Sequence, residues 1–250
     1  MTSRTLLGML TPSSNTILEP VSSAIVAACP DVSVHFGRFQ VTKISLEEGV
    51  IGQFNFGPML AAAELLADAQ VEAICWNGTS SGWLGLQADR NLCKIIQDRT
   101  SIPATSSVLT LFDAFHRIGA TRIGLVTPYL DEVQEKIIEN FHSEGFDCIA
   151  ERHLNDADNF SFSQVSESTI AEMVRAVARE KPHAITIFCT NLRGARIAAV
   201  LEKELDIPIY DTVATAVFGA LRIAGMDLAE IKGWGSLFQS NRGIRARKTN

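Results

Sequence analysis

Two short loops carry the residues of this sequence whose types best suit chemistry. One contains the thiol of Cys189, and the other, Gly78–Ser80, contains two hydroxyls but no acid, base or nucleophile at its tip. A thiol can act as a nucleophile or as a proton donor. A loop of small polar residues can bind an anion through its N–H and O–H groups. The two loops therefore predict thiol chemistry beside an anion site.

Cys189 is the one cysteine to which we assign a function. It follows an apolar run, Ala184–Phe188, and precedes a helical pattern that begins at Arg193. A thiol at a helix N-terminus feels the positive end of the dipole, which favours thiolate, whereas burial favours the neutral thiol. Arg193 could add positive potential or hold a carboxylate. The alternative, a buried structural cysteine, is our prediction for Cys29, Cys75, Cys93 and Cys148.

Thr79 and Ser80 form the predicted anion site. Their hydroxyl and N–H groups lie beside Gly78, which adds no bulk. Each well-aimed donor to a developing oxyanion is worth about 3 kcal/mol. The alternative is a serine-rich N-cap of the next helix. Both roles can hold together, because a cap and an anion site use the same N–H groups.

A second pair of loops, Thr11–Asn15 and Thr127–Tyr129, is also polar. Asn15 could donate its amide to a carboxylate, and Tyr129 could donate its O–H to an oxyanion. The alternative for Asn15 is a turn or cap residue. Tyr129 is one of only two tyrosines, and a polar loop is an unusual place for a packing role. We therefore favour function for both residues.

Strand-like runs alternate with amphipathic helical patterns along the chain. This alternation predicts an α/β fold with a mainly parallel sheet, whose ligands bind at the carboxyl ends of the strands. The predicted strands are Thr5–Leu10, Val32–Gln40, Ala73–Asn77, Arg122–Val126 and Ala184–Phe188. The predicted helices include Pro58–Ala69, Asp131–Ser143, Thr169–Glu180 and Arg193–Glu204.

The sequence also repeats itself, with three short correspondences in the same order. The matched pairs are Gly8–Pro12 with Gly124–Pro128, Ala73–Thr79 with Ala184–Thr190, and Ile102–Thr110 with Ile207–Thr215. The alternative is that the similarity is generic, because all βα folds reuse similar strand–turn–helix patterns. The Thr-Pro and Ile-Pro pairs, however, recur at matched places. We predict two similar halves that face each other across a cleft. Residues 1–115 plus 213–250 would form the N-terminal half, and residues 116–212 the C-terminal half.

The repeat places Gly78 at the position that Cys189 occupies in the other half. One half therefore presents a thiol at the end of its strand, and the other presents a hydrogen atom. This asymmetry limits the chemistry to one thiol.

Composition excludes several other classes of function. The chain has 250 residues, 46% of them hydrophobic, and a formal charge of −6, so we expect neither a nucleic acid nor a membrane as partner. Five scattered cysteines without a CxxC pair predict neither disulfides nor zinc and are typical of the cytoplasm. Nucleotide, dinucleotide and metal motifs are absent, so we expect no cofactor. The sequence leaves a homo-oligomer open.

Four segments together resemble the aspartate/glutamate racemase superfamily, in its arylmalonate decarboxylase and maleate cis-trans isomerase branch. The segments are Thr11–Asn15, Gly78–Ser80, Thr127–Tyr129 and Cys189–Arg193. The resemblance implies two flavodoxin-like parallel-sheet halves related by pseudo-twofold symmetry, with the active site in the cleft between them. Racemases and maleate isomerases of this superfamily carry a cysteine in each half. With Gly78 in the first half, the sequence resembles the arylmalonate decarboxylases better.

The resemblance implies a cofactor-independent decarboxylase that acts on a small dicarboxylic acid. Thr79, Ser80 and Tyr129 would hold a carboxylate and stabilise the enediolate left after loss of carbon dioxide, and Cys189 would protonate it. The substrate-binding residues would be Pro12, Ser13, Ser14, Asn15, Gly78, Asn159, Thr190 and Asn191. We expect the apolar wall of the pocket to come from Phe39–Ile44 and Trp83.

Two other functions stay open. The stretch Cys189–Arg193 looks more like the isomerases, and Ser81–Gly85 departs from the decarboxylases. A maleate isomerase or racemase that uses a non-standard second group is therefore one alternative. A non-catalytic protein that binds carboxylates is the other.

Overall fold

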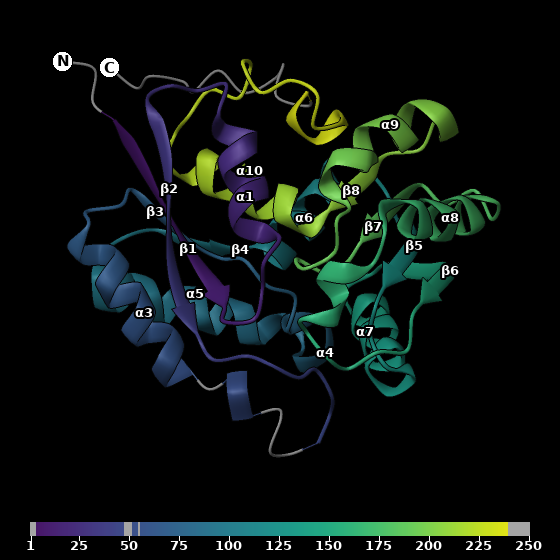
Figure 1. The fold of residues 1–250 in the computed structure, drawn as a ribbon, viewed down its shortest axis with the longest axis horizontal. Helices are drawn as coiled ribbons and strands as arrows, with labels where there is room; N and C mark the ends of the chain where they lie inside the picture. The colour runs from purple at the N-terminus through teal and green to yellow at the C-terminus, as the bar shows by residue number, and fades with distance from the viewer. Residues whose placement is uncertain (1–3, 48–51, 55, 240–250) are drawn as a thin grey trace.

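The fold is known from a computed structural model, which describes residues 4–47, 52–54 and 56–239. Residues 240–250, which end the predicted N-terminal half, lie outside the described residues. Two four-stranded sheets, each in its own half, form the centre of the molecule (Figure 1). Within the described ranges, no helix is long and apolar enough to cross a membrane.

The first sheet has the strand order β2-β1-β3-β4, and all its pairings are parallel. The strands are β1 (Thr5–Pro12), β2 (Val32–Phe39), β3 (Ala73–Trp76) and β4 (Ala104–Ser106). The central strand β3 is buried along its whole length. Parallel strands covered on both faces need such continuous apolar sequence, which is why this segment reads as AICW.

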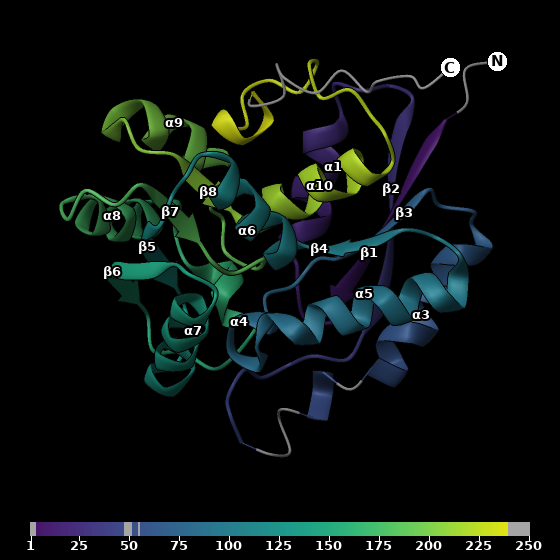
Figure 2. The same cartoon turned by 180° about the vertical axis from the view of Figure 1, so that it is seen from behind.

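Helices cover both faces of this sheet. On one side, α3 (Phe56–Asp68) packs against α5 (Leu86–Thr100). On the other, α1 (Leu18–Val26) packs against α10 (Thr212–Ile223), although α10 comes from the far end of the chain. The view from behind shows α3 and α5 together below the strands and α10 with α1 above them (Figure 2).

The second sheet has the order β6-β5-β7-β8 and is also parallel. Its strands are β5 (Arg122–Thr127), β6 (Asp147–His153), β7 (Ala184–Ile187) and β8 (Ile209–Asp211). The helices of this half are α7 (Asp131–Ser143), α8 (Glu167–Ala178) and α9 (Ala195–Leu205). The short α4 (Ser81–Leu84) and α6 (Ser107–Arg117) complete the helices that bear on the site.

The registers of the central pairs, β1–β3 and β5–β7, match as the sequence repeat predicts, whereas β5–β6 has a register shift between Ile123 and Gly124 that β1–β2 lacks. Gly8 pairs with Ile74 in the first sheet, and Gly124 pairs with Ile185 in the second. At the other side of the central strands, Trp76 pairs with Ser106 and Ile187 with Asp211. The predicted α/β fold of two similar halves is confirmed.

Two helices tie the halves together. Helix α6 packs against α10, and its Phe112 and Phe115 meet aromatic rings of the second half, namely Phe141, Phe146 and Tyr210. Helix α10 follows β8 of the second half but packs on β3 and β4 of the first. The boundaries of the halves, with α6 assigned to the first, stay a prediction.

Candidate active site

The carboxyl ends of the central strands bring the two predicted loops to one narrow cavity. The cavity is lined by Pro12, Val41, Ile44, Phe54, Trp76, Gly78, Thr79, Ser80, Trp83, Tyr129, Asn159, Cys189 and Thr190. The empty volume between the lining atoms is about 280 Å³, part of which is open solvent. The cavity suits a small ligand.

Cys189 is 2% exposed, and its raised pKa keeps the thiol neutral near pH 7. Burial raises the pKa of its thiol to about 12, and hydrogen bonding with the Tyr129 hydroxyl and with the N–H groups of Asn191 and Leu192 only partly lowers it. The negative charge of Asp211 raises the pKa further. At neutral pH this thiol keeps its proton, so it can act as a proton donor and provides little thiolate to act as a nucleophile.

The predicted helix start next to Cys189 is wrong. Helix α9 begins at Ala195, two residues later than expected, and no side chain caps it. The intervening turn folds back so that the Asn191 N–H donates to the sulfur at 3.4 Å and the Leu192 N–H donates to the Cys189 carbonyl at 3.2 Å. Local N–H groups therefore replace the helix dipole as the polar surroundings of the thiol.

Tyr129 joins the two halves at the cavity. Its hydroxyl lies 2.7 Å from the Thr79 hydroxyl and also hydrogen-bonds with Cys189. Burial, and then the nearby Cys189, raise the pKa of the phenol well above its usual value, so it remains an O–H donor. The ring is held edge-on against Trp83 at 5.3 Å and Phe162 at 5.6 Å. A developing oxyanion at this point would meet a fixed donor.

The loop that contains Thr79 and Ser80 keeps its backbone donors free. Ser80 stands at the N-cap of α4, but its side chain makes no cap hydrogen bond. Within the described part of the chain, the backbone N–H groups of both residues donate to no protein acceptor. The Ser107 hydroxyl donates to the Gly78 carbonyl and so fixes the loop. The geometry is suited to an anion.

Eight of the predicted site residues line the cavity: Pro12, Gly78, Thr79, Ser80, Tyr129, Asn159, Cys189 and Thr190. Four others, Ser13, Ser14, Asn15 and Asn191, do not. Direct contact between these four and a substrate stays a prediction, and the cavity geometry gives it no support.

Asn15 and Asn191 instead hold the loops of the two halves together. Asn15 accepts from the N–H of Ile17 and Leu18 at the start of α1, and its amide donates to Thr190 at 3.1 Å. Asn191 accepts from the N–H of Thr16 at 3.0 Å. These contacts fix the loop that carries Cys189.

Asn159 lies on the cavity wall but its amide is already engaged. It donates to the Ser14 hydroxyl at 2.8 Å, and its carbonyl accepts from the Asn191 amide. Ser14 in turn donates to the Val41 carbonyl at 2.6 Å. The chain of contacts connects three loops behind the cavity.

The apolar wall contains two expected residues of the Phe39–Ile44 stretch, Val41 and Ile44, together with Trp83 as expected. Sequence reasoning missed Phe54 and, above all, Trp76. Trp76 ends β3 two residues before Gly78. Its position at the end of a buried strand that leads into the predicted site could have identified it as a wall residue.

Asp211 is a buried carboxyl near the thiol. It caps α10 by accepting from the N–H of Val213 and Ala214, while its Oδ2 atom has no partner among the described residues. Burial raises its pKa to about 7. Ser106 occupies the matching position of the repeat and caps α6 with a neutral side chain. The extra charge explains why Asp211 opposes ionisation of Cys189.

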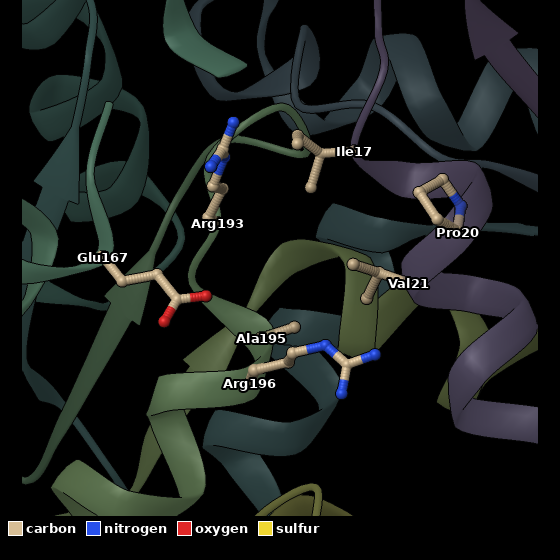
Figure 3. Close-up of a pocket in the computed structure, with 7 residues that line it drawn as sticks. All are labelled: Ile17, Pro20, Val21, Glu167, Arg193, Ala195 and Arg196. Atoms are coloured by element: carbon tan, nitrogen blue, oxygen red, sulfur yellow. The ribbon is translucent and has the colours of Figure 1, made fainter. Parts of the chain in front are cut away.

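A second, larger cavity lies between α1 and the loop that leads into α9 (Figure 3). Arg193 and Arg196 line it together with Glu167, the first residue of α8. Arg193 donates its Nε to the Ser163 carbonyl at 2.8 Å. The sequence suggested that Arg193 could hold a carboxylate beside Cys189. In the structure, Arg193 lines this second cavity and does not line the cavity of Cys189. In the part of the chain that the structure describes, no cluster of side chains could hold a metal ion.

Comparison with known proteins places these features in one family. The family model described as arylmalonate decarboxylase matches residues 47–238. A maleate isomerase from Nocardia farcinica is 22% identical over 249 residues, which cover 96% of this chain and 98% of that protein. An arylmalonate decarboxylase from Bordetella bronchiseptica is 24% identical over 167 residues, which cover 66% of this chain and 70% of that protein.

Solved structures show the same fold. A mutant of the Nocardia farcinica maleate cis-trans isomerase with a covalently bound succinylcysteine intermediate aligns with a TM-score of 0.88 at 21% identity, covering 95% of this chain and 99% of that one. A structure of arylmalonate decarboxylase aligns with a TM-score of 0.77 at 19% identity, covering 94% and 99%. With the family match over most of its length, this chain belongs to the arylmalonate decarboxylase family of enzymes, within the aspartate/glutamate racemase superfamily.

Proposed function

We propose that this protein is a cofactor-independent decarboxylase that acts on a small malonic acid with an aliphatic substituent. One observation carries the proposal. The cavity has a neutral, buried thiol, Cys189, on one loop and no thiol on the matched loop, where Gly78 stands. A single proton donor suits the protonation of an enediolate from one face.

The reaction would proceed in two steps. The bond between the α-carbon and one carboxylate breaks, carbon dioxide leaves, and the electron pair of that bond forms an enediolate with the other carboxylate. The α-carbon of the enediolate then takes the proton of Cys189, which leaves a thiolate that solvent reprotonates. Thr79, Ser80 and Tyr129 are the donors that would stabilise the enediolate charge.

The wall of the cavity favours loss of one particular carboxylate. Val41, Ile44 and Phe54 present apolar surface, whereas the polar donors gather at Thr79 and Tyr129. A carboxylate that faces apolar atoms loses hydration, and its conversion to neutral carbon dioxide relieves that cost. The other carboxylate keeps hydrogen-bond donors throughout.

The test is release of carbon dioxide from methylmalonate and ethylmalonate by the purified protein. We expect Cys189→Ala to lower kcat by about 10²- to 10⁴-fold. Cys148→Ala is the matched control, since burial also raises the pKa of that thiol to about 12 and it lies outside the cavity. Equal turnover by wild type and Cys189→Ala would refute the role of the thiol.

Maleate isomerisation is the second candidate function, because several relatives of this chain carry that name. It would require Cys189, or another group, to add to the double bond as a nucleophile, although the raised pKa of Cys189 leaves little thiolate at pH 7. Conversion of maleate to fumarate, followed by proton NMR, would favour it. Tight binding of dicarboxylates without any turnover would favour the non-catalytic alternative.

A further inference from the structure

Trp76 fills the space in which a side chain at position 78 would lie. An ideal Cβ atom on Gly78 would stand 2.1 Å from Cζ2, 2.3 Å from Cη2 and 2.6 Å from Cε2 of the Trp76 ring. Such distances are far inside van der Waals contact. The edge of the indole that faces Gly78 therefore includes Cε2, the carbon to which Nε1 is bonded.

The position of this ring is well fixed. Trp76 is the last residue of β3 and pairs in register with Leu10 on one side and Ser106 on the other. Its side chain is 1% exposed and packs against Phe39, with ring centroids 5.3 Å apart. The indole is therefore a fixed part of the cavity wall.

The Trp76 indole N–H is buried and has no hydrogen-bond partner among the described residues. Leaving a buried donor unsatisfied is costly, and most buried polar groups in folded proteins are paired. Trp76 lines the same cavity as Thr79, Ser80 and Cys189. A ligand in that cavity is the natural partner for this donor, as it is for the Trp83 indole N–H, which lines the same cavity and is also unpaired among the described residues.

The charge of the cavity defines what this ligand should be. None of its described lining residues carries a charge at neutral pH, since Cys189 and Tyr129 remain protonated. A dicarboxylate must then be held by neutral N–H and O–H donors. An indole N–H donates and never accepts, so it discriminates in favour of a carboxylate oxygen.

We propose that Trp76 is a specificity-determining residue of this site. Its indole N–H binds a substrate carboxylate on the Gly78 side, and its ring limits the α-substituent to a small aliphatic group. This inference rests on the proposed function, because it takes the ligand to be a malonate. It concerns binding, so it can be tested without turnover.

The direct test uses malonate as the probe. The chain has three tryptophans, so its proton–nitrogen NMR spectrum has three indole signals, and Trp76→Phe identifies one of them. We expect that signal to move downfield when malonate binds to the wild-type protein. Calorimetry should show malonate binding about 10- to 100-fold more weakly to Trp76→Phe, as expected for one hydrogen bond to a charged group.

Trp234→Phe is the matched control. It also removes an indole N–H, but that ring stacks with Arg196 at 5.3 Å and does not line the cavity. We expect this variant to bind malonate within about twofold of wild type, because no hydrogen bond to the ligand is lost. Should Trp76→Phe prove unfolded, Trp76→Leu, which also lacks the indole N–H, identifies the signal instead, and its shift in the wild-type spectrum decides.

The size restriction is tested with a second pair of probes, methylmalonate and phenylmalonate. Trp76→Leu should improve the binding of phenylmalonate relative to methylmalonate by at least about tenfold, because the smaller side chain opens the wall. Wild-type protein that binds phenylmalonate as tightly as methylmalonate would overturn this part of the proposal.

Other outcomes separate this inference from the proposed function. An unmoved Trp76 signal and unchanged malonate affinity in Trp76→Phe would overturn the inference, even if decarboxylation is observed. A shifted signal without any release of carbon dioxide would support the inference and count against the decarboxylase. Failure of malonates and maleate to bind at all would overturn both.

Discussion

The Cys189 thiol lies between a tyrosine hydroxyl and a buried carboxyl, and burial dominates its ionisation. Its pKa of about 12 keeps the proton on sulfur across the whole physiological range. The sequence suggested a contest between a helix dipole and burial. In the structure, burial has the larger effect on the pKa of Cys189, and the helix begins only at Ala195.

We therefore expect Cys189 to be slow to alkylate. At pH 8 iodoacetamide should modify it at least about 100-fold more slowly in the native protein than in the unfolded chain, since the thiolate is the reactive form. Mass spectrometry of timed samples measures this, with the less buried Cys29 as an internal comparison. Native labelling as fast as unfolded labelling would show that the thiol is exposed and ionised.

A thiol cannot simply be restored at position 78. A Cβ there would meet the Trp76 ring, so we expect Gly78→Cys and Gly78→Ala each to destabilise the protein by about 1–3 kcal/mol through overpacking. Urea unfolding measures the loss, and Trp76→Leu should recover part of it in the double variant.

Gly52→Ala is the control for that series, because a Cβ at Gly52 would meet nothing within 4 Å. Unchanged stability in Gly78→Ala would mean that the indole moves aside freely. That result would also weaken the proposed donor role of Trp76.

At the scale of elements, the caps of two equivalent helices differ in a way that bears on the site. Ser106 caps α6 and Asp211 caps α10, at matched positions of the repeat. Asp211 is the only one of the two that can carry charge. The second half thus combines a thiol and a buried carboxyl, whereas the first half has neither at these positions.

Asp211 should make stability fall as pH rises. Its pKa is raised from 3.8 to about 7, so the folded state binds a proton that the unfolded state has lost between about pH 4 and pH 7. Asp211→Asn keeps the cap but removes this penalty, so it should gain about 2–4 kcal/mol relative to wild type at pH 8 and nothing at pH 4.

Thermal unfolding between pH 4 and pH 8 measures this difference, with the exposed Asp98→Asn as control. Asp89, whose pKa burial raises to about 6, adds a slope of the same sign in both proteins. A parallel pH dependence for wild type and Asp211→Asn would show that Asp211 is ionised in the folded state at little cost.

Elements with strong local patterns were predictable, and their junctions were not. The bounds of α7 agree with the sequence pattern at both ends, because Pro128 and Gly145 flank an amphipathic run. The loop after Cys189 was placed wrongly, because its shape depends on Asn191 contacts with Thr16 and Asn159, distant in sequence. Trp76 was missed for a similar reason, since only the packing on Phe39 and Gly78 shows where its ring points.

On the scale of the whole molecule, duplication creates the site by opposing two equivalent strand ends. The repeat predicted both sheets and the pairing of Gly78 with Cys189, and the matched registers confirm the former. The sequence assigned residues 213–250 to the first half, and α10 does pack on β3 and β4 of that half, whereas the aromatic contacts of α6 with the second half were not predicted. These contacts fix the halves relative to each other and so fix the cavity.

The central claim is that one thiol delivers a proton to one face of the enediolate. The stereochemistry of decarboxylation of ethyl(methyl)malonate tests it most directly, because the product, 2-methylbutyrate, is chiral and its substituents are small. Chiral chromatography should show essentially one enantiomer from the wild-type protein and a rate at least about 10²-fold lower from Cys189→Ala. A racemic product, or one enantiomer formed equally fast without Cys189, would contradict the account.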